Sequence, residues 1–183
     1  MIIPKACVAA AALLMIASGC SSETQMDASK RLDQPQIIIL QADGLARPDG
    51  TLLHYGSDIK SVTAMIERFG PVDQHRNTDC GAGPMAFVAS PATGLTANFQ
   101  NDQLVGWFYD GNGRSARLVN DISVGSTYTE LSNAMPVEMQ ADSTLGVEFF
   151  AGDPAGFVGG FLSGQSHDAV VESLYSGTNC FFR

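Results

Sequence analysis

The spacing of apolar residues between positions 57 and 69 predicts an amphipathic helix. Five large side chains recur every three or four positions, so they fall on one helical face: Ile59, Val62, Met65, Ile66 and Phe69. Ser57 is placed to cap the first turn, and Gly70-Pro71 marks the end, because glycine and proline are typical of helix C-termini. We therefore expect a helix that is capped by Ser57 and runs to about Phe69.

Runs of β-branched and aromatic residues between turn-forming residues predict strands on both sides of this helix. The segment Val72–Gly83, directly after the helix, is polar and is expected to be irregular. In chain order the expected strands are 36–41, 52–55, Met85–Ala89, Leu95–Phe99, Leu104–Tyr109 and Ser115–Val119.

A second helix and a second set of strands are predicted in the C-terminal half. Thr127 and Glu130 have the spacing of a capping box, in which each side chain bonds the backbone N–H of the other residue. Tyr128, Leu131 and Met135 share one helical face, and the proline that follows ends the helix. The strands expected after it are Leu145–Phe150, Phe157–Leu162 and Ala169–Tyr175.

The two halves show matching segments. Gly56-Ser57 matches Gly125-Ser126, Gly94–Phe99 matches Leu145–Phe150, and Gly106-Trp107 matches Gly159–Phe161. These matches predict tandem units of one helix and three strands, over 37–119 and 120–183, which can merge into one sheet. Two unrelated meanders are the alternative. We expect an α+β fold with mostly antiparallel strands and two short helices, in one globular domain over 37–183.

The first nineteen residues predict an export signal. Met1–Lys5 carries one positive charge, and Ala6–Ile16 is an apolar run too short to cross a bilayer. Ala17-Ser18-Gly19 before Cys20 resembles the lipobox of bacterial lipoproteins. The resemblance implies removal of residues 1–19 and acylation of Cys20, and Ser21 then favours the periplasmic face of the outer membrane. An ordinary signal peptide with an incidental cysteine is the alternative.

Residues 20–36 are mostly polar and read as an acylated cysteine followed by a flexible tether. The whole chain is acidic, with a formal net charge of −9. It contains no cluster of lysine and arginine, which argues against nucleic acid and anionic lipid headgroups as partners.

The four cysteines have different expected fates. Cys7 leaves with the signal and Cys20 is acylated, so Cys80 and Cys180 remain. In an oxidising compartment one remaining pair favours a disulfide. Two free thiols or a catalytic cysteine are the alternatives.

Three chemical motifs occur, but their context is wrong. Gly111-x-Gly113-x-x-Ala116 fits a loose dinucleotide fingerprint, yet it leads into a predicted strand instead of a helix. Ser57-x-x-Lys60 has the spacing of acyl-serine enzymes but lacks their companion motifs. The third, the glycine-rich run 152–164, lacks the lysine of a phosphate-binding loop.

Histidines and aromatic residues complete the candidate chemistry. His54, His75 and His167 have no ligand spacing, so we expect no metal, no cofactor and no catalytic residue. The consecutive residues Trp107, Phe108 and Tyr109 alternate between the two faces of a strand. We take the three as candidate partner-binding residues, with core packing and incidental exposure as the alternative.

Several segments resemble a family of small uncharacterised bacterial secreted and lipid-anchored proteins. They are Asp79–Met85 (DCGAGPM), Leu95–Gln100, Leu104–Trp107 and the tail Gly177–Arg183 (GTNCFFR). The resemblance covers nearly the whole mature domain and implies a cysteine pair, but no activity. The order of helix and meander also looks like the small lipoproteins of outer-membrane assembly (the SmpA/OmlA kind) and, in tandem form, the β-lactamase-inhibitor protein. Those proteins bind other proteins, and that likeness concerns the fold alone.

We therefore expect a membrane-anchored periplasmic lipoprotein with a non-catalytic binding or scaffolding role, whose partner is another envelope protein. One alternative is an inhibitor or sensor of a periplasmic enzyme that uses the loop Val72–Gly83. An enzyme is the remaining alternative.

Overall fold

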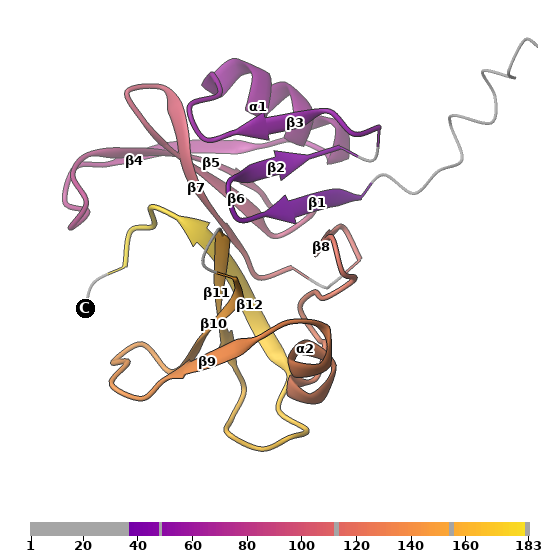
Figure 1. The fold of residues 1–183 in the computed structure, drawn as a ribbon. Helices are drawn as coiled ribbons and strands as arrows, with labels where there is room; N and C mark the ends of the chain where they lie inside the picture. Colours follow the sequence, from indigo (N-terminus) through magenta and orange to yellow (C-terminus); the bar gives the residue numbers. More distant parts are fainter. Residues whose placement is uncertain (1–36, 48, 112–113, 154–155, 182–183) are drawn as a thin grey trace, which may run out of the picture. The chain divides into compact units, whose positions relative to one another are not determined.

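The computed structural model describes residues 37–47, 49–111, 114–153 and 156–181, which belong to one compact unit. The predicted signal peptide, Cys20 and the tether lie outside the described residues. Within them the chain is mostly β, with two sheets and two short α-helices (Figure 1). The expected α+β class therefore holds in a sheet-dominated form.

The larger sheet has eight antiparallel strands in the order β4-β5-β6-β7-β12-β11-β10-β9. The last strand of the chain, β12 (yellow), thus lies between β11 and β7 (Figure 1). The strands are β4 (Asp73–Asn77), β5 (Met85–Ser90), β6 (Leu95–Gln100), β7 (Gln103–Tyr109), β9 (Val137–Gln140), β10 (Val147–Asp153), β11 (Gly156–Leu162) and β12 (Val171–Gly177).

The smaller sheet has four strands in the order β3-β2-β1-β8. They are β1 (Ile38–Gln41), β2 (Gly44–Ala46), β3 (Leu52–His54) and β8 (Ala116–Leu118). β1 and β8 pair in parallel, and the other pairs are antiparallel. Apolar side chains of this sheet and of the helices pack with one side of the larger sheet to form the main core, which contains Leu40, Leu45, Val62, Trp107 and Leu174. We call that side the core face and the opposite side the open face.

The first helix, α1 (Ile59–Ile66), continues as a 3₁₀ turn, η2 (Glu67–Phe69). Its N-cap is Asp58, whose carboxylate accepts the N–H of Lys60 at 2.8 Å. The prediction of Ser57 as the cap was therefore wrong. Ser57 instead belongs to the preceding turn, since its N–H donates to His54 O and its carbonyl accepts from Leu104 N.

The second helix, α2 (Tyr128–Ala134), confirms the predicted capping box. The Thr127 hydroxyl accepts the Glu130 N–H at 3.1 Å, and the Glu130 carboxylate accepts the Thr127 N–H at 2.7 Å. Met135 has extended backbone and ends the helix.

The expectation of an irregular segment at Val72–Gly83 was wrong in its first half, which forms the strand β4. All five residues of β4 are polar, so the segment lacks the apolar alternation of a half-buried strand. β4 and β9 are the edges of the larger sheet, where polar and charged residues are tolerated and discourage pairing with other chains. β9 does alternate apolar and polar residues, but it is only four residues long and was not expected for that reason.

Each α-helix is followed by a four-stranded antiparallel meander. The entry to the helix is built alike in both halves, because Gly56 N donates to Leu104 O and Gly125 N to Val171 O, each at 2.8 Å. Both glycines have a φ of 91°, a left-handed conformation that favours glycine. Leu104 and Val171 therefore hold corresponding places at the start of β7 and β12.

The strand registers agree with this correspondence. The pairing of β6 with β7 shifts between Asn98 and Phe99, and that of β11 with β12 shifts between Phe161 and Leu162. These shifts fall beside Leu104 and Val171, so β6 corresponds to β11 and β5 to β10. The predicted match of Gly94–Phe99 with Leu145–Phe150 was wrong by one strand, because the edge strand of each unit had not been expected.

Candidate functional site

The three candidate aromatic residues of β7 lie on different faces of the sheet. Trp107 and Tyr109 point into the core and are fully buried, so they contribute nothing to a partner surface. Phe108 lies on the open face and is half-buried. The strand period of two predicted this division, and only Phe108 remains a surface candidate.

Phe108 is joined on the open face by four aromatic residues that the sequence did not single out. We call Phe108, Phe150, Phe161, Tyr175 and Phe181 the aromatic cluster. Their rings lie in edge-to-face or tilted contacts, with centroids 4.9–6.3 Å apart, and Tyr175 contacts three of the other four. Such geometry stabilises aromatic pairs beyond simple burial. The cluster thus forms one continuous apolar surface.

Glycine at position 159 allows the rings to meet. Gly159 lies opposite Phe150 on one side and opposite Tyr175 on the other. A Cβ atom there would come within 2.2 Å of Tyr175 Cζ, a distance that no real Cβ contact shows. The ring of Tyr175 therefore covers backbone that has no side chain of its own. Phe157, two residues earlier on β11 and 48 % exposed, has its side chain on the same face.

A buried carboxyl group lies beneath the cluster. Glu148 on β10 has no exposed surface, and its carboxylate accepts a hydrogen bond from the hydroxyl of Tyr175. The polar end of Tyr175 thus points inward to a partner, as buried tyrosine hydroxyls usually do. The arrangement holds the central ring of the cluster in one position.

The C-terminal segment crosses the open face and adds the fifth ring. Gly177, with a φ of 66°, redirects the chain at the end of β12. The side-chain amide of Asn98 then donates to Thr178 O at 3.0 Å and to Asn179 Oδ1 at 2.7 Å. Phe181 is brought against Phe108 and Tyr175 by this path.

The predicted disulfide between Cys80 and Cys180 is present, with the Cα atoms 5.1 Å apart. It ties the C-terminal segment to the loop between β4 and β5. Cys80 is buried in a small apolar cluster with Met85 and Phe87, against which Val105 and Cys180 pack. The disulfide therefore holds the segment that carries Phe181 beside the aromatic cluster.

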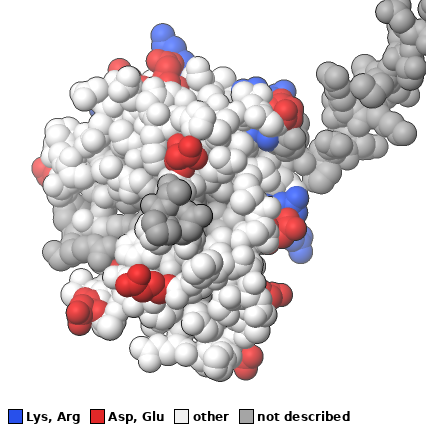
Figure 2. Space-filling model, in the orientation of Figure 1, with Lys and Arg blue, Asp and Glu red and all other residues white. Residues whose placement is uncertain are grey.

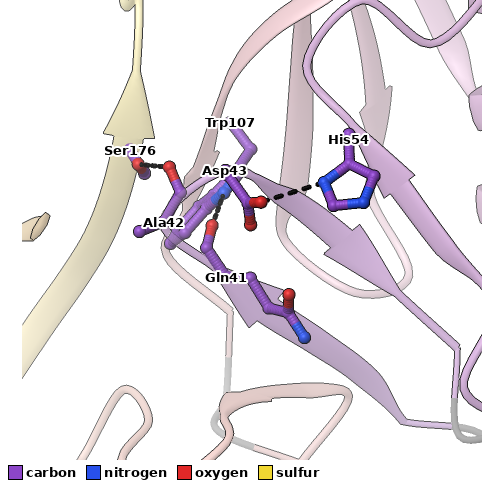
Figure 3. A network of polar contacts seen from close by, with 6 residues as sticks. All are labelled: Gln41, Ala42, Asp43, His54, Trp107 and Ser176. Atoms are coloured by element: carbon purple, nitrogen blue, oxygen red, sulfur yellow. Dashed lines mark hydrogen bonds and ion pairs between the residues drawn. The ribbon is translucent and has the colours of Figure 1, made fainter. Parts of the chain in front are cut away.

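On the core face the same junction of β7 and β12 is supported by the turn between β1 and β2 (Figure 3). Trp107 Nε1 donates to Gln41 O at 2.8 Å, and Ser176 Oγ donates to Ala42 O at 2.6 Å. Trp107 and Ser176 lie opposite each other in the sheet. One turn thus binds both halves of the larger sheet where they meet.

Asp43 in this turn bonds His54, with 2.9 Å between Oδ2 and Nδ1 (Figure 3). Both side chains are about 60 % exposed, at 59 % for His54 and 61 % for Asp43. Within the described residues His54 makes no other side-chain bond, and the hydroxyl of nearby Ser176 is directed to Ala42 O. The pair is therefore an exposed contact between the end of β3 and the turn between β1 and β2.

Tyr55 is packed next to the same junction. Its ring lies so close to Gly177 that an added Cβ atom would be 2.7 Å from the hydroxyl oxygen. Burial raises the pKa of Tyr55 to about 12, and the hydroxyl of Ser176 opposes that shift. The charge of Asp43 raises the same pKa further.

The remaining histidines lie on separate elements. His75 on β4 stacks on Phe87 with ring centroids 4.8 Å apart, and His167 lies 6.0 Å from the ring of Tyr128. Across the described ranges no three His, Cys, Asp or Glu residues come together as metal ligands would. The segment after Gly111 contains the strand β8 and not a helix, which removes the context of a dinucleotide site.

The two units differ sharply in charge. Residues 37–119 contain six lysines and arginines, whereas residues 120–181 contain none. In the view of Figure 2 the basic side chains lie near the upper and right-hand margins, and acidic ones are scattered more widely. The acidic residues of 120–181 are Asp121, Glu130, Glu138, Asp142, Glu148, Asp153, Asp168 and Glu172.

Three of the four missed members of the cluster had a usable signal, and Phe181 had none. Phe150, Phe161 and Tyr175 fall in expected strands, where the period of two would have put them on defined faces. What the sequence lacked was the pairing of β7 with β12, which joins distant segments.

Comparison of the chain with protein-family models, with curated proteins and with solved structures found no match. No helix in the described ranges has the length and apolarity needed to span a bilayer.

Proposed function

We propose that the mature chain is a non-catalytic, lipid-anchored envelope protein that binds another envelope protein through the aromatic cluster. The observation that supports this most is the gathering of five rings, from four strands and the C-terminal segment, on the open face of a sheet. Aromatic residues are enriched in the energetically important centres of protein interfaces. Because they keep few rotatable bonds, they bind partners at a low entropic cost.

The charge pattern specifies the chemistry of the partner. Four of the eight strands of the larger sheet lie within residues 120–181, which include eight acidic residues and no lysine or arginine. Glu138, which is exposed, lies directly opposite Phe150 at the rim of the cluster. The complementary surface is an apolar centre surrounded by lysine and arginine, and opposite charges speed the encounter of such surfaces.

The proposed anchor sets where this binding takes place. Acyl chains on Cys20 hold the protein at the periplasmic face of the outer membrane. The domain can therefore meet partners that are embedded in or bound to the same membrane.

We also infer that the two units arose as tandem copies that fused into one sheet. The matching helix entries, the matching register shifts and the pairing of β7 with β12 support this. In this interpretation the cluster lies where the two copies meet, and the disulfide and Phe181 were added around it.

Site-specific photocrosslinking in intact cells tests the proposed surface. A photoreactive phenylalanine analogue at Phe157, on the open face, should form an adduct with a distinct protein. The matched control is the same analogue at Val119, which is 71 % exposed and lies outside the larger sheet.

The adduct at position 157 should fall when salt is raised during crosslinking in membranes, and its partner should expose basic residues at the crosslinked region. Equal adducts at both positions, or an adduct that salt does not affect, would contradict the proposal. If the captured protein is a periplasmic enzyme that loses activity on binding, the chain is an inhibitor.

A further inference from the structure

We infer that the second unit contains a binding site for a small organic cation, next to the aromatic cluster, with which it shares the buried Glu148. The site is a cavity of about 540 Å³ where α2 begins and where the β9–β10 and β11–β12 loops meet. Its volume lies within the range of ligand pockets in proteins. Its walls include Tyr128, Met139, Gln140, Ala141, Gln165 and His167.

The first unit has a cavity at the corresponding place. The strand registers and helix entries make Ile59 correspond to Tyr128, Arg76 to Ala141, and Phe87 to Glu148. All three residues of the first unit line a cavity of about 120 Å³, and all three counterparts line the larger one. The position is therefore a recurring feature of the unit and not an isolated packing defect.

Particular substitutions account for the difference in volume. In the first unit Arg76 extends to Asp102, and His75 stacks on Phe87. In the second unit alanine replaces the arginine, and the turn between the last two strands becomes the loop 163–170. These changes remove bulk and add a wall that carries Gln165 and His167.

The chemistry of the larger cavity favours a cation with an apolar body. The ring of Tyr128 and the thioether of Met139 provide apolar contact and, for the ring, attraction to a cation. The arginine of the first unit is absent here, and residues 120–181 contain no lysine or arginine to attract an anion. Asp142 and Asp168 do not line the cavity, but both are exposed and adjoin lining residues, Ala141 and His167 respectively. A cation is therefore attracted electrostatically, whereas an anion is repelled.

A titration with choline tests the site, with binding measured by the amide chemical shifts of the full mature protein. Choline should produce saturable shifts for Gln140, Ala141 and His167. Its neutral isostere 3,3-dimethylbutan-1-ol should bind roughly tenfold more weakly or not at all, and acetate should give no saturable shift.

The decisive variant is Ala141→Arg, which places the arginine of the first unit into the exposed position 141. It should weaken choline binding by roughly tenfold or more while the protein stays folded, as judged by the unchanged remainder of the spectrum. Arg76→Ala is the matched control and should leave binding in the second unit unchanged. Absence of saturable choline shifts, equal binding of the neutral isostere, or unaltered binding by Ala141→Arg would overturn the inference.

Discussion

Phe108 and Tyr175 lie directly opposite each other where β7 pairs with β12, and each is the counterpart of the other in the two units. The correspondence follows from Leu104 and Val171, which accept equivalent hydrogen bonds from the two helix entries. Counting four residues along each strand leads to Phe108 and Tyr175. A residue that faces its own counterpart marks an approximate two-fold axis, as in the interface of a symmetric dimer.

Removing one hydroxyl from this pair should destabilise the domain. In Tyr175→Phe the carboxylate of Glu148 loses a hydrogen-bond donor while it stays buried. This should lower the free energy of unfolding, measured by urea denaturation, by about 1–3 kcal/mol. Tyr128→Phe removes a hydroxyl from a partly exposed ring and should change stability by less than about 0.5 kcal/mol. Equal stability of both variants would contradict the role given to the Glu148–Tyr175 bond.

The disulfide should contribute both stability and order to the open face. Cys80 and Cys180 are 100 residues apart, for which the chain-entropy model gives about 4.7 kcal/mol. The double variant Cys80→Ser, Cys180→Ser should unfold at lower urea, and added dithiothreitol should destabilise only the wild type.

Loss of the disulfide should also make the segment that carries Phe181 more mobile. We expect faster hydrogen exchange at the Thr178 amide, which donates to Val105 O, and stronger binding of a hydrophobic dye. The amide of Val171 on the same strand is the internal reference, because it is held by Ser126. Unchanged exchange at Thr178 would show that Asn98 holds the segment without the disulfide.

Tyr55 should make stability depend on alkaline pH. Burial raises its pKa to about 12, whereas the unfolded chain titrates near the ordinary value of 10. Between these values the unfolded state loses its proton first, so stability is intact below pH 10 and falls as the pH rises towards 12. This group can lower the free energy of unfolding by at most about 1.4 kcal/mol per pH unit. Tyr55→Phe should remove this component, and the ultraviolet difference titration between the two proteins should show a midpoint near 12.

The two helix caps should make comparable and independent contributions. Thr127→Ala removes the acceptor of the Glu130 N–H, and Asp58→Ala removes that of the Lys60 N–H. Each substitution should lower the free energy of unfolding by about 1 kcal/mol in chemical denaturation. The double variant should lose the sum of the two, because the caps belong to different helices. Ser132→Ala, inside α2, serves as the reference. A loss of stability in only one of the two cap variants would contradict the equivalence of the two helix entries.

The parts of the fold that local pattern predicted are those with one buried face. β5, β6, β7 and the second capping box were expected because apolar periodicity and capping chemistry are local properties of the chain. β4 was not expected because an edge strand with polar residues on both faces has no such period, and β9 was not expected because its alternation covers only four residues. Overlooking them also shifted the predicted match between the units by one strand.

The candidate site depended on a different kind of information. The face of Phe108 followed from the strand period, but its neighbours Tyr175 and Phe181 lie far away in sequence. Only the pairing of β7 with β12 and the path fixed by Asn98 bring these three rings together. A register between distant strands has no signature in either strand alone, so the cluster required the structure.

A single methyl group added at position 159 should disturb the arrangement of the aromatic cluster while the domain remains folded. In Gly159→Ala the new Cβ atom would meet the ring of Tyr175 within 2.2 Å, so the ring must move or the strands must part. We expect a loss of about 1–3 kcal/mol, the usual cost of an overpacked site. Gly164→Ala is the control, since its Cβ would meet nothing within 4 Å. If partner binding depends on the arrangement of the rings, the crosslink from position 157 should disappear in Gly159→Ala at temperatures where the domain remains folded. It should persist in Gly164→Ala, and persistence in both would show that the partner contacts another surface.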